Sequence, residues 1–115
     1  LDAINIGEPI FLLEKGEPKR DFLHVEDFAR ACQAFIDSDV THGLYNLGGG
    51  YQNTLTLRQL VEKIEQIVGA TAVIDESVKT PSPVPFNYVS DISKIEYELK
   101  WKPAISIEEG LRKIL

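Results

Sequence analysis

The basic residues that stand closest together in the first half of the chain are Lys15, Lys19 and Arg20. They surround a turn marked by Gly16 and Pro18, in a chain with 18 acidic and 12 basic residues. Arginine presents planar, paired N–H donors that suit a phosphate group. The pattern indicates an anion pocket. From residue types alone, however, solvated charges on a turn are the simpler interpretation.

A glycine triplet, Gly48 to Gly50, follows a predicted strand and continues as Tyr-Gln-Asn. The pattern G-x-G-x-x-N is one residue short of the dinucleotide fingerprint, whose third glycine allows close helix–strand packing. Asn53 occupies that third position, and the next predicted helix starts only after Thr56. We therefore interpret the triplet as a turn with a positive φ at one or more of its positions.

The other residue types that carry chemistry are scattered. His24 and His42 are far apart and lack the spacing of a metal site. We interpret His24 as a partly buried structural residue and Cys32 as inert core on the apolar face of a helix. The adjacent acids Glu26 and Asp27 suit the positive end of a helix dipole better than acid–base catalysis.

These residues must be positioned by short, interleaved elements. Strands are expected at 9–14, 21–25, 44–47, 71–74 and 87–89, and helices from about 26, over 57–68, from about 91 and from about 107. The clearest helix is 57–68, where Thr56 and Gln59 form a capping box and Gly69 is a suitable C-terminal cap. The interleaving predicts a mixed α/β or α+β class.

Composition excludes several classes of protein. The net charge of −6 and the pI of about 4.8 repel nucleic-acid backbones, so no nucleic-acid partner is expected. One cysteine cannot form an intrachain disulfide and fits a reducing cytoplasm. No apolar run approaches the roughly 20 residues of a membrane helix, so no membrane partner is expected. The 115 residues suit a single domain.

Five segments together resemble a known family. Residues 20–31, R-D-F-L-H-V-E-D-F-A-R-A, resemble the R-D-[FY]-[IL]-[HY]-V-x-D-x-[AV]-x-[AG] segment of NAD-dependent epimerase/dehydratases. These are extended short-chain dehydrogenase/reductases that modify nucleotide sugars. Segments 44–50, 88–94, 99–103 and 106–111 resemble four further family segments in the same order. Within the family, 87–91 and the glycine triplet lean slightly toward paratose/tyvelose-type (CDP-linked) 2-epimerases.

The resemblance implies that the chain is the C-terminal, substrate-binding part of a Rossmann-type enzyme. The N-terminal Rossmann core would lie upstream and bind NAD or NADP, so no cofactor is expected in this fragment. The family's catalytic Tyr-x-x-x-Lys pair is missing, because no tyrosine here has a lysine four residues later. We expect no catalytic, cofactor-binding or metal-binding residue in this chain. The full-length enzyme would be a cytoplasmic homodimer, an isomerase or lyase.

Site roles come from matching positions in the family pattern. Arg20 corresponds to an arginine that contacts the substrate's pyrophosphate, and Phe22 occupies an aromatic position beside it. Ile10 and Leu12 lie on the segment that passes the nucleotide base. The partner implied by these four positions is a nucleoside-diphosphate sugar.

One departure from the pattern concerns the second phosphate-binding arginine, which many relatives supply in an R-x-G-D stretch. Pro81 falls at that arginine, and Lys79 or Thr80 is the nearest polar substitute. Glu14 also stands near the expected anion, where the family has G-[DN]-G. A different loop path, a different substrate and weak phosphate binding all remain open.

The function that follows is the substrate-binding region of a nucleotide-sugar epimerase or dehydratase. The complete enzyme would oxidise a sugar carbon with NAD(P)+ and then complete an epimerisation, elimination or reduction. This chain alone is expected neither to bind NAD tightly nor to turn over. The alternatives are a stand-alone nucleotide-sugar binding module and part of a related reductase that acts on a non-sugar carbonyl.

Overall fold

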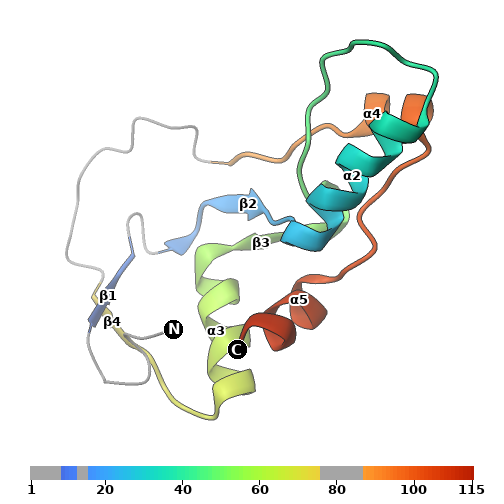
Figure 1. Ribbon diagram of the computed structural model, residues 1–115. Helices are drawn as coiled ribbons and strands as arrows, with labels where there is room; N and C mark the ends of the chain where they lie inside the picture. Colours follow the sequence, from blue (N-terminus) through green and yellow to red (C-terminus); the bar gives the residue numbers. More distant parts are fainter. Residues whose placement is uncertain (1–8, 13–15, 76–86) are drawn as a thin grey trace. The chain divides into compact units, whose positions relative to one another are not determined.

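The computed structural model describes residues 9–12, 16–75 and 87–115 (Figure 1). The elements are β1 (Pro9–Phe11), β2 (Lys19–Asp21), α2 (Val25–Asp37), the 3-10 turn η2 (Tyr51–Asn53), β3 (Thr54–Thr56), α3 (Leu57–Val68), β4 (Val73–Asp75), α4 (Ser93–Leu99) and α5 (Ile107–Ile114). Strands and helices alternate, which confirms the mixed α/β class. Among the described helices, none combines the length and apolar character needed to cross a membrane.

The chain divides into two compact units. Unit 1 takes the described residues up to Arg20, those from Leu55 to Tyr88, and Leu111–Leu115. Unit 2 takes Asp21–Thr54 and Val89–Gly110. The expectation of one substrate-binding domain over 1–115 stays a prediction.

A two-stranded parallel sheet and helix α3 build unit 1. Strand β1 pairs with β4 so that Ile10 lies opposite Ile74. Beyond the strand, the Leu12 amide donates to the Asp75 carbonyl at 3.1 Å. The predicted strands 9–14 and 71–74 are found as β1 and β4, and residues 13–14 of the first prediction lie outside the described residues. A second sheet pairs β2 with β3.

Helix α3 matches its sequence prediction at both ends. The Thr56 hydroxyl accepts from the Gln59 amide at 3.0 Å, and the Gln59 side-chain carbonyl accepts from the Thr56 amide at 2.9 Å. Gly69 ends the helix with a left-handed φ of 72°. The capping box and the glycine stop, both read from sequence, are confirmed.

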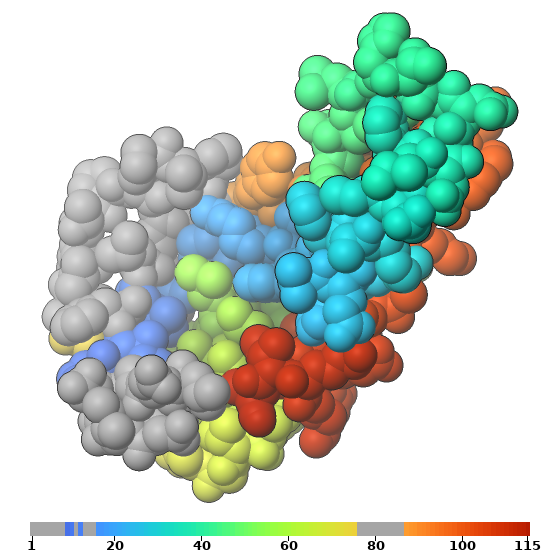
Figure 2. Space-filling model, in the orientation of Figure 1, coloured from blue at the N-terminus to red at the C-terminus, as the bar shows by residue number. Residues whose placement is uncertain are grey.

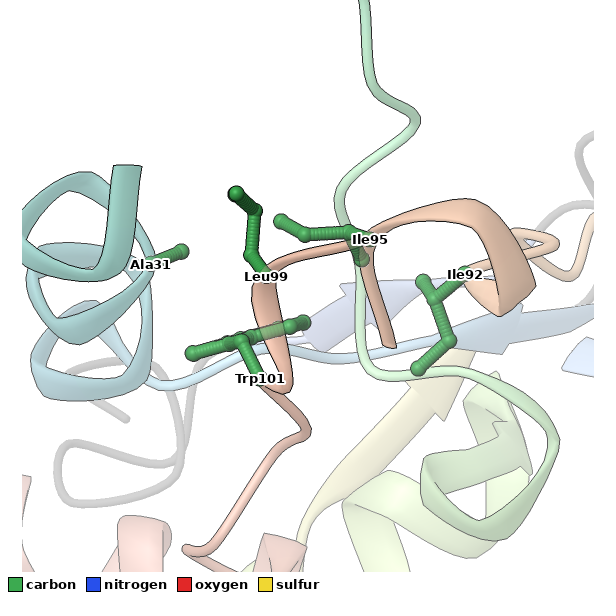
Figure 3. Close-up of a cluster of buried hydrophobic side chains, with 5 residues drawn as sticks. All are labelled: Ala31, Ile92, Ile95, Leu99 and Trp101. Atoms are coloured by element: carbon green, nitrogen blue, oxygen red, sulfur yellow. The ribbon is translucent and has the colours of Figure 1, made fainter. Parts of the chain in front are cut away.

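The core of unit 2 is a cluster of five buried side chains (Figure 3). Its members are Ala31 of α2, Ile92, Ile95 and Leu99 at α4, and Trp101. The indole N–H of Trp101 donates to the Asp27 carbonyl at 3.1 Å. The cluster therefore joins α2 to α4 and to the segment that follows α4.

Helix α4 ends on an unusual residue. Its C-cap is Lys100, which is the one described non-glycine residue with a positive φ, at 53°. The Lys100 ammonium lies 5.0 Å from the centre of the Tyr97 ring. The resembled family segment L-G-W-x-P has glycine at this position, where a left-handed backbone is normally accommodated.

Three expectations about local structure are wrong. Residues 44–47 form no strand, because unit 2 offers them no neighbouring strand among the described residues. Residue Tyr88 makes only an isolated bridge to Arg20. The expected strand 21–25 is not found either, because β2 ends at Asp21, residues 22–24 are irregular and α2 begins at Val25.

The expectation for Cys32 is also wrong. Cys32 is exposed on α2. Helix α2 buries Ala31 in a cluster with α4, whereas the next residue, Cys32, is left exposed. The apolar stripe of α2 is therefore wider than the surface that α4 covers.

Candidate functional site

The surroundings of Arg20 lie at the end of β2 that belongs to unit 1. The Lys19 carbonyl accepts from the Tyr88 amide at 2.9 Å and from the Arg20 guanidinium at 2.7 Å. The Asn87 side-chain carbonyl accepts from the Lys19 amide at 3.0 Å. Arg20 is half-buried, and these bonds tie 87–88 beside its strand. The Arg20 guanidinium, the Tyr88 ring and the Asn87 side-chain amide thus belong to neighbouring segments of backbone.

Ile10 and Leu12 lie in the same unit as Arg20. Ile10 is half-buried on β1, whereas Leu12 is only 5% exposed. A Cβ on Gly16 would lie 2.8 Å from a methyl carbon of Leu12 and 3.2 Å from the Arg58 amide nitrogen. Gly16 has a φ of 70°, so this position needs glycine both for its backbone and for this packing. The Leu12 side chain is part of that packing.

Phe22 belongs to unit 2, two residues beyond Arg20. It is half-buried, and its amide donates to the Asn53 carbonyl at 2.9 Å. Lys79, Thr80, Pro81, Glu14 and Lys15 lie outside the described residues. In the division into units, Arg20, Ile10 and Leu12 belong to unit 1, whereas Phe22 belongs to unit 2.

The glycine triplet packs against the chain that leaves β2. A Cβ on Gly48 would collide with the Asp21 carboxylate and the Ser90 hydroxyl, and one on Gly49 with the Phe22 carbonyl. Gly50 has a φ of 75°, and its amide donates to the Asp21 carboxylate at 3.1 Å. The interpretation as a positive-φ turn is confirmed.

The same contacts test the triplet as a dinucleotide site. A phosphate-binding loop aims free amides and a helix N-terminus at the anion. Here a carboxylate already accepts from the Gly50 amide, and a 3-10 turn and strand β3 follow in place of an α-helix. The triplet does not fit a dinucleotide pyrophosphate.

A polar cavity of about 610 Å³ opens between the glycine turn and the start of α4. Its lining includes Asn53, Ser90, Asp91, Glu96 and Lys102. The Asp91 carboxylate accepts from the Ser93 amide at 3.0 Å, and the hydrogen bonds from Ser93 hold the pKa of Asp91 below its ordinary value. Sequence reasoning missed this cavity, although the Asp-x-Ser spacing is typical of an Asp side chain that accepts from the amide two residues later.

Among the residues that the structure describes, the most deeply buried polar side chain is Asp27, in the first turn of α2. Its carboxylate accepts from the Ala104 amide at 3.1 Å, from the Ile105 amide at 2.9 Å and from the Arg30 guanidinium. Arg30 also donates to the Lys102 carbonyl at 3.1 Å. The carboxylate thus anchors 102–105 to α2.

The electrostatics of Asp27 follow from these partners. Burial by itself raises the pKa of this carboxyl, but the hydrogen bonds from Arg30, Ile105 and Ala104 outweigh it and leave the pKa below 3.8. Sequence reasoning assigned Asp27 to the helix dipole and missed the anchor. Arg30, three residues further on, was the available signal.

His24 caps the same helix. Its Nδ1 accepts from the Glu26 amide at 3.0 Å, and its Nε2 is buried without a partner among the described residues. Within the described ranges, no group of three His, Cys, Asp or Glu side chains could hold a metal ion. His24 therefore has a structural role as the N-cap of α2.

The fold and these segments define an α/β protein of the extended short-chain dehydrogenase/reductase class. Residues 1–114 match the family model of GDP-mannose 4,6 dehydratase, and the chain belongs to this family of NAD-dependent epimerases and dehydratases. The resemblance read from the sequence is thereby confirmed.

The curated relatives are longer enzymes. The chain is 34% identical over 106 residues to UDP-glucuronate 4-epimerase of Thermodesulfobacterium geofontis, covering 92% of this chain and 32% of that protein. It is 28% identical over 116 residues to dTDP-4-dehydro-6-deoxyglucose reductase of Escherichia coli, covering 100% and 35%. The chain spans about a third of the length of the curated relatives that it matches.

Solved structures show the same relation. The dTDP-glucose 4,6-dehydratase of Bacillus anthracis in complex with NAD superposes with a TM-score of 0.81 at 27% identity, covering 97% of this chain and 35% of that one. The UDP-glucose 4-epimerase of Thermotoga maritima with UDP-glucose gives 0.80 at 26% identity, covering 96% and 35%. The fold is that of a segment of these Rossmann-type enzymes.

Proposed function

We propose that this chain is the substrate-binding region of a nucleotide-sugar epimerase or dehydratase and binds a nucleoside-diphosphate sugar. The relatives are named for UDP-, GDP- and dTDP-linked sugars, so the diphosphate is what their substrates share. The observation that carries the proposal is Arg20, a guanidinium held on β2 in a chain of net charge −6. A local cation in an acidic protein is a selective site for an anion.

Each predicted residue has a part in this proposal. Arg20 donates paired N–H groups to the pyrophosphate. Ile10 and the backbone at Leu12 border the nucleotide base, while the buried Leu12 side chain packs against Gly16. Phe22 offers an aromatic face, and Lys79 supplies a second cation in place of the missing arginine.

The contribution of this chain to the reaction is binding and orientation. In the complete enzyme, a hydride would pass from a sugar carbon to NAD(P)+ before epimerisation, elimination or reduction. The reacting groups belong to polypeptide outside this chain. Binding energy from the remote diphosphate holds the sugar in place, which is a recognised source of rate. The weaker likeness to paratose/tyvelose-type 2-epimerases stays a prediction.

Calorimetric titration with UDP-, dTDP-, GDP- and CDP-sugars tests the proposal. Arg20→Ala should weaken binding about 10- to 100-fold, because a hydrogen bond to a charged group is worth roughly 1.5–3 kcal/mol. Arg112→Ala, an exposed arginine on α5, removes the same charge elsewhere and should leave binding within about twofold. Equal affinities for the Arg20→Ala variant and the unaltered chain would refute the assigned role.

A turnover assay separates the proposal from its alternatives. The 115-residue chain should show no turnover with any of these sugars and NAD+. Detectable turnover would overturn the assignment of the reacting groups to other polypeptide. If a longer natural polypeptide containing this chain bound the sugars and never reacted, the binding-module alternative would replace the enzyme.

A further inference from the structure

The Asn87 side chain contacts the edge of β2, although Asn87 lies 68 positions after Lys19 in the sequence. Its carbonyl accepts from the Lys19 amide at 3.0 Å, and the next residue, Tyr88, donates its amide to the Lys19 carbonyl at 2.9 Å. Tyr88 also forms a parallel bridge with Arg20. The segment that begins at residue 87, orange in Figure 2, lies beside the blue atoms around β2. Residues 87 and 88 thus bond both backbone polar groups of Lys19.

The Asn87 bond takes the place of a backbone bond in the sheet. In a parallel ladder, the amide and the carbonyl that a residue directs to one edge are bonded by backbone groups of the neighbouring strand. The Lys19 carbonyl has such a backbone donor in Tyr88, whereas the Lys19 amide has the Asn87 side chain as its acceptor. A slip of one residue would turn Tyr88 away from the face that it shares with Arg20. The Asn87 side chain therefore fixes the register of Tyr88 beside Arg20.

The Lys19 carbonyl also bonds the guanidinium of Arg20. It accepts from Nη1 of Arg20 at 2.7 Å, so one oxygen serves both the guanidinium and the Tyr88 amide. The Lys19 amide and carbonyl belong to the two planar peptide units on either side of its Cα, so bonds to both restrict φ and ψ of the residue before Arg20. A guanidinium has five N–H donors and can bond a backbone carbonyl and an anion at the same time. The direction of the Lys19 carbonyl thus influences the direction of the guanidinium.

We propose that Asn87 is a positioning residue for the anion site at Arg20. Its side chain does not touch the ligand: it fixes the Lys19 backbone and, through the Lys19 carbonyl, orients the Arg20 guanidinium toward the diphosphate. This role rests on the proposed function, because it requires that Arg20 binds the diphosphate. Asparagine suits the position, since its neutral carbonyl accepts from the Lys19 amide without placing a negative charge beside the anion.

Calorimetric titration tests this role with two probes, inorganic pyrophosphate and the nucleotide sugar that the unaltered chain binds most tightly. Asn87→Ala removes the acceptor of the Lys19 amide. The affinity for both probes should fall about 3- to 10-fold, as expected for the loss of one neutral hydrogen bond. Asn46→Ala is the matched control, because it removes the same side chain from an exposed position in unit 2, and it should change both affinities by less than about twofold.

A double-mutant cycle separates a positioning role from a direct contact with the ligand. If Asn87 acts through Arg20, Asn87→Ala should change the affinity of the Arg20→Ala chain by less than about twofold. Losses that multiply in the double variant would mean that Asn87 acts on the ligand independently of Arg20, and they would overturn the proposed role. Binding by the unaltered chain that Asn87→Ala leaves unchanged would overturn this role and leave the proposed function standing. If the unaltered chain bound neither probe, both would be refuted.

Amide hydrogen exchange measures the backbone effect in the absence of ligand. In Asn87→Ala, the Lys19 amide should exchange at least about threefold faster, because it has lost its acceptor. The Leu57 amide bonds the Pro18 carbonyl on the β3 side of β2 and should keep its rate. Equal acceleration at Lys19 and Leu57 would mean that the variant loosens the whole strand, and an unchanged rate at Lys19 would mean that Asn87 does not hold it. Either result would overturn the proposed role.

Discussion

Helices α3 and α2 begin in contrasting ways, although both are amphipathic helices of similar length. At α3, the start is set by Thr56 and Gln59, three residues apart, which satisfy each other's amides. At α2, His24 makes a short-range cap, but Asp27 in the first turn bonds an amide 77 positions away. The first device depends only on local sequence. The second exists only when distant parts of the chain have come together.

The difference indicates which interaction each unit needs most for its stability. Loss of a local cap frays one end of a helix, whereas loss of a buried anchor leaves several polar groups without partners at once. Unit 2 should therefore depend on one carboxylate more heavily than unit 1 depends on any one side chain of its capping box.

The largest effect is expected for Asp27→Ala. This variant leaves the part-buried Ala104 and Ile105 amides and the half-exposed Arg30 guanidinium without their acceptor. It should cost about 2–4 kcal/mol of unfolding free energy, because a buried donor left without a partner costs about 1–3 kcal/mol. Urea unfolding followed by the fluorescence of Trp101, the chain's one tryptophan, measures the loss in unit 2.

Glu26→Ala is the control, since it removes the neighbouring acid from the same helical turn. It should cost about 0.3–1 kcal/mol, the usual worth of an acidic side chain at a helix start. Equal losses in the two variants would mean that Asp27 acts through the helix dipole alone, as the sequence suggested.

A smaller effect is expected for Thr56→Ala in the α3 cap. The variant removes one acceptor for the Gln59 amide and should cost about 0.5–2 kcal/mol. Amide hydrogen exchange in the first turn of α3 should become faster, while the last turn before Gly69 changes little. A cost equal to that of Asp27→Ala would abolish the contrast between the two helices.

Thr56→Ser restores the hydroxyl and serves as the matched control. Serine caps helices as well as threonine does, so exchange in the first turn should return close to its original rate. Persistent fast exchange in Thr56→Ser would assign the effect to the lost methyl group.

The smallest effect is expected from acid. Because the folded-state pKa of Asp27 lies below 3.8, its ionised form stabilises the fold above that pH, and this contribution is lost as the pH falls through the folded pKa. Unfolding midpoints measured from pH 6 to pH 2 should fall below about pH 4, and the fall should be shallower in Asp27→Asn. If the unaltered chain and Asp27→Asn lost stability equally in acid, Asp27 would not be the cause of that loss.

The sequence predicted the parts of this fold that depend on neighbouring residues. The α3 cap, the Gly69 stop and the positive-φ glycine turn were all found, because each is decided within a few residues. The mixed α/β class was found because predicted strands and helices alternate along the chain, and the family was found because five segments retained their order.

The misses have a common cause. Residues 44–47 look like a strand, but a strand needs a partner that local sequence does not contain. Cys32 fits the apolar stripe of α2, but the width of the surface covered by α4 is set by tertiary packing. The backbone amides that donate to Asp27 could not be found from local sequence for the same reason, since they lie 77 and 78 positions away. For the site, sequence placed Arg20 by resemblance, while the polar cavity at Asp91 emerged only from the fold.

Lys100 is a position at which a single substitution should increase the thermal stability of the chain. A left-handed residue other than glycine carries a backbone cost of roughly 1–2 kcal/mol, and the contact of its ammonium with Tyr97 returns only about 0.5–1 kcal/mol at an exposed site. Lys100→Gly should therefore raise thermal stability slightly, as a scan of melting temperature would show. Position 100 is therefore the first residue to change in a more stable variant of this segment.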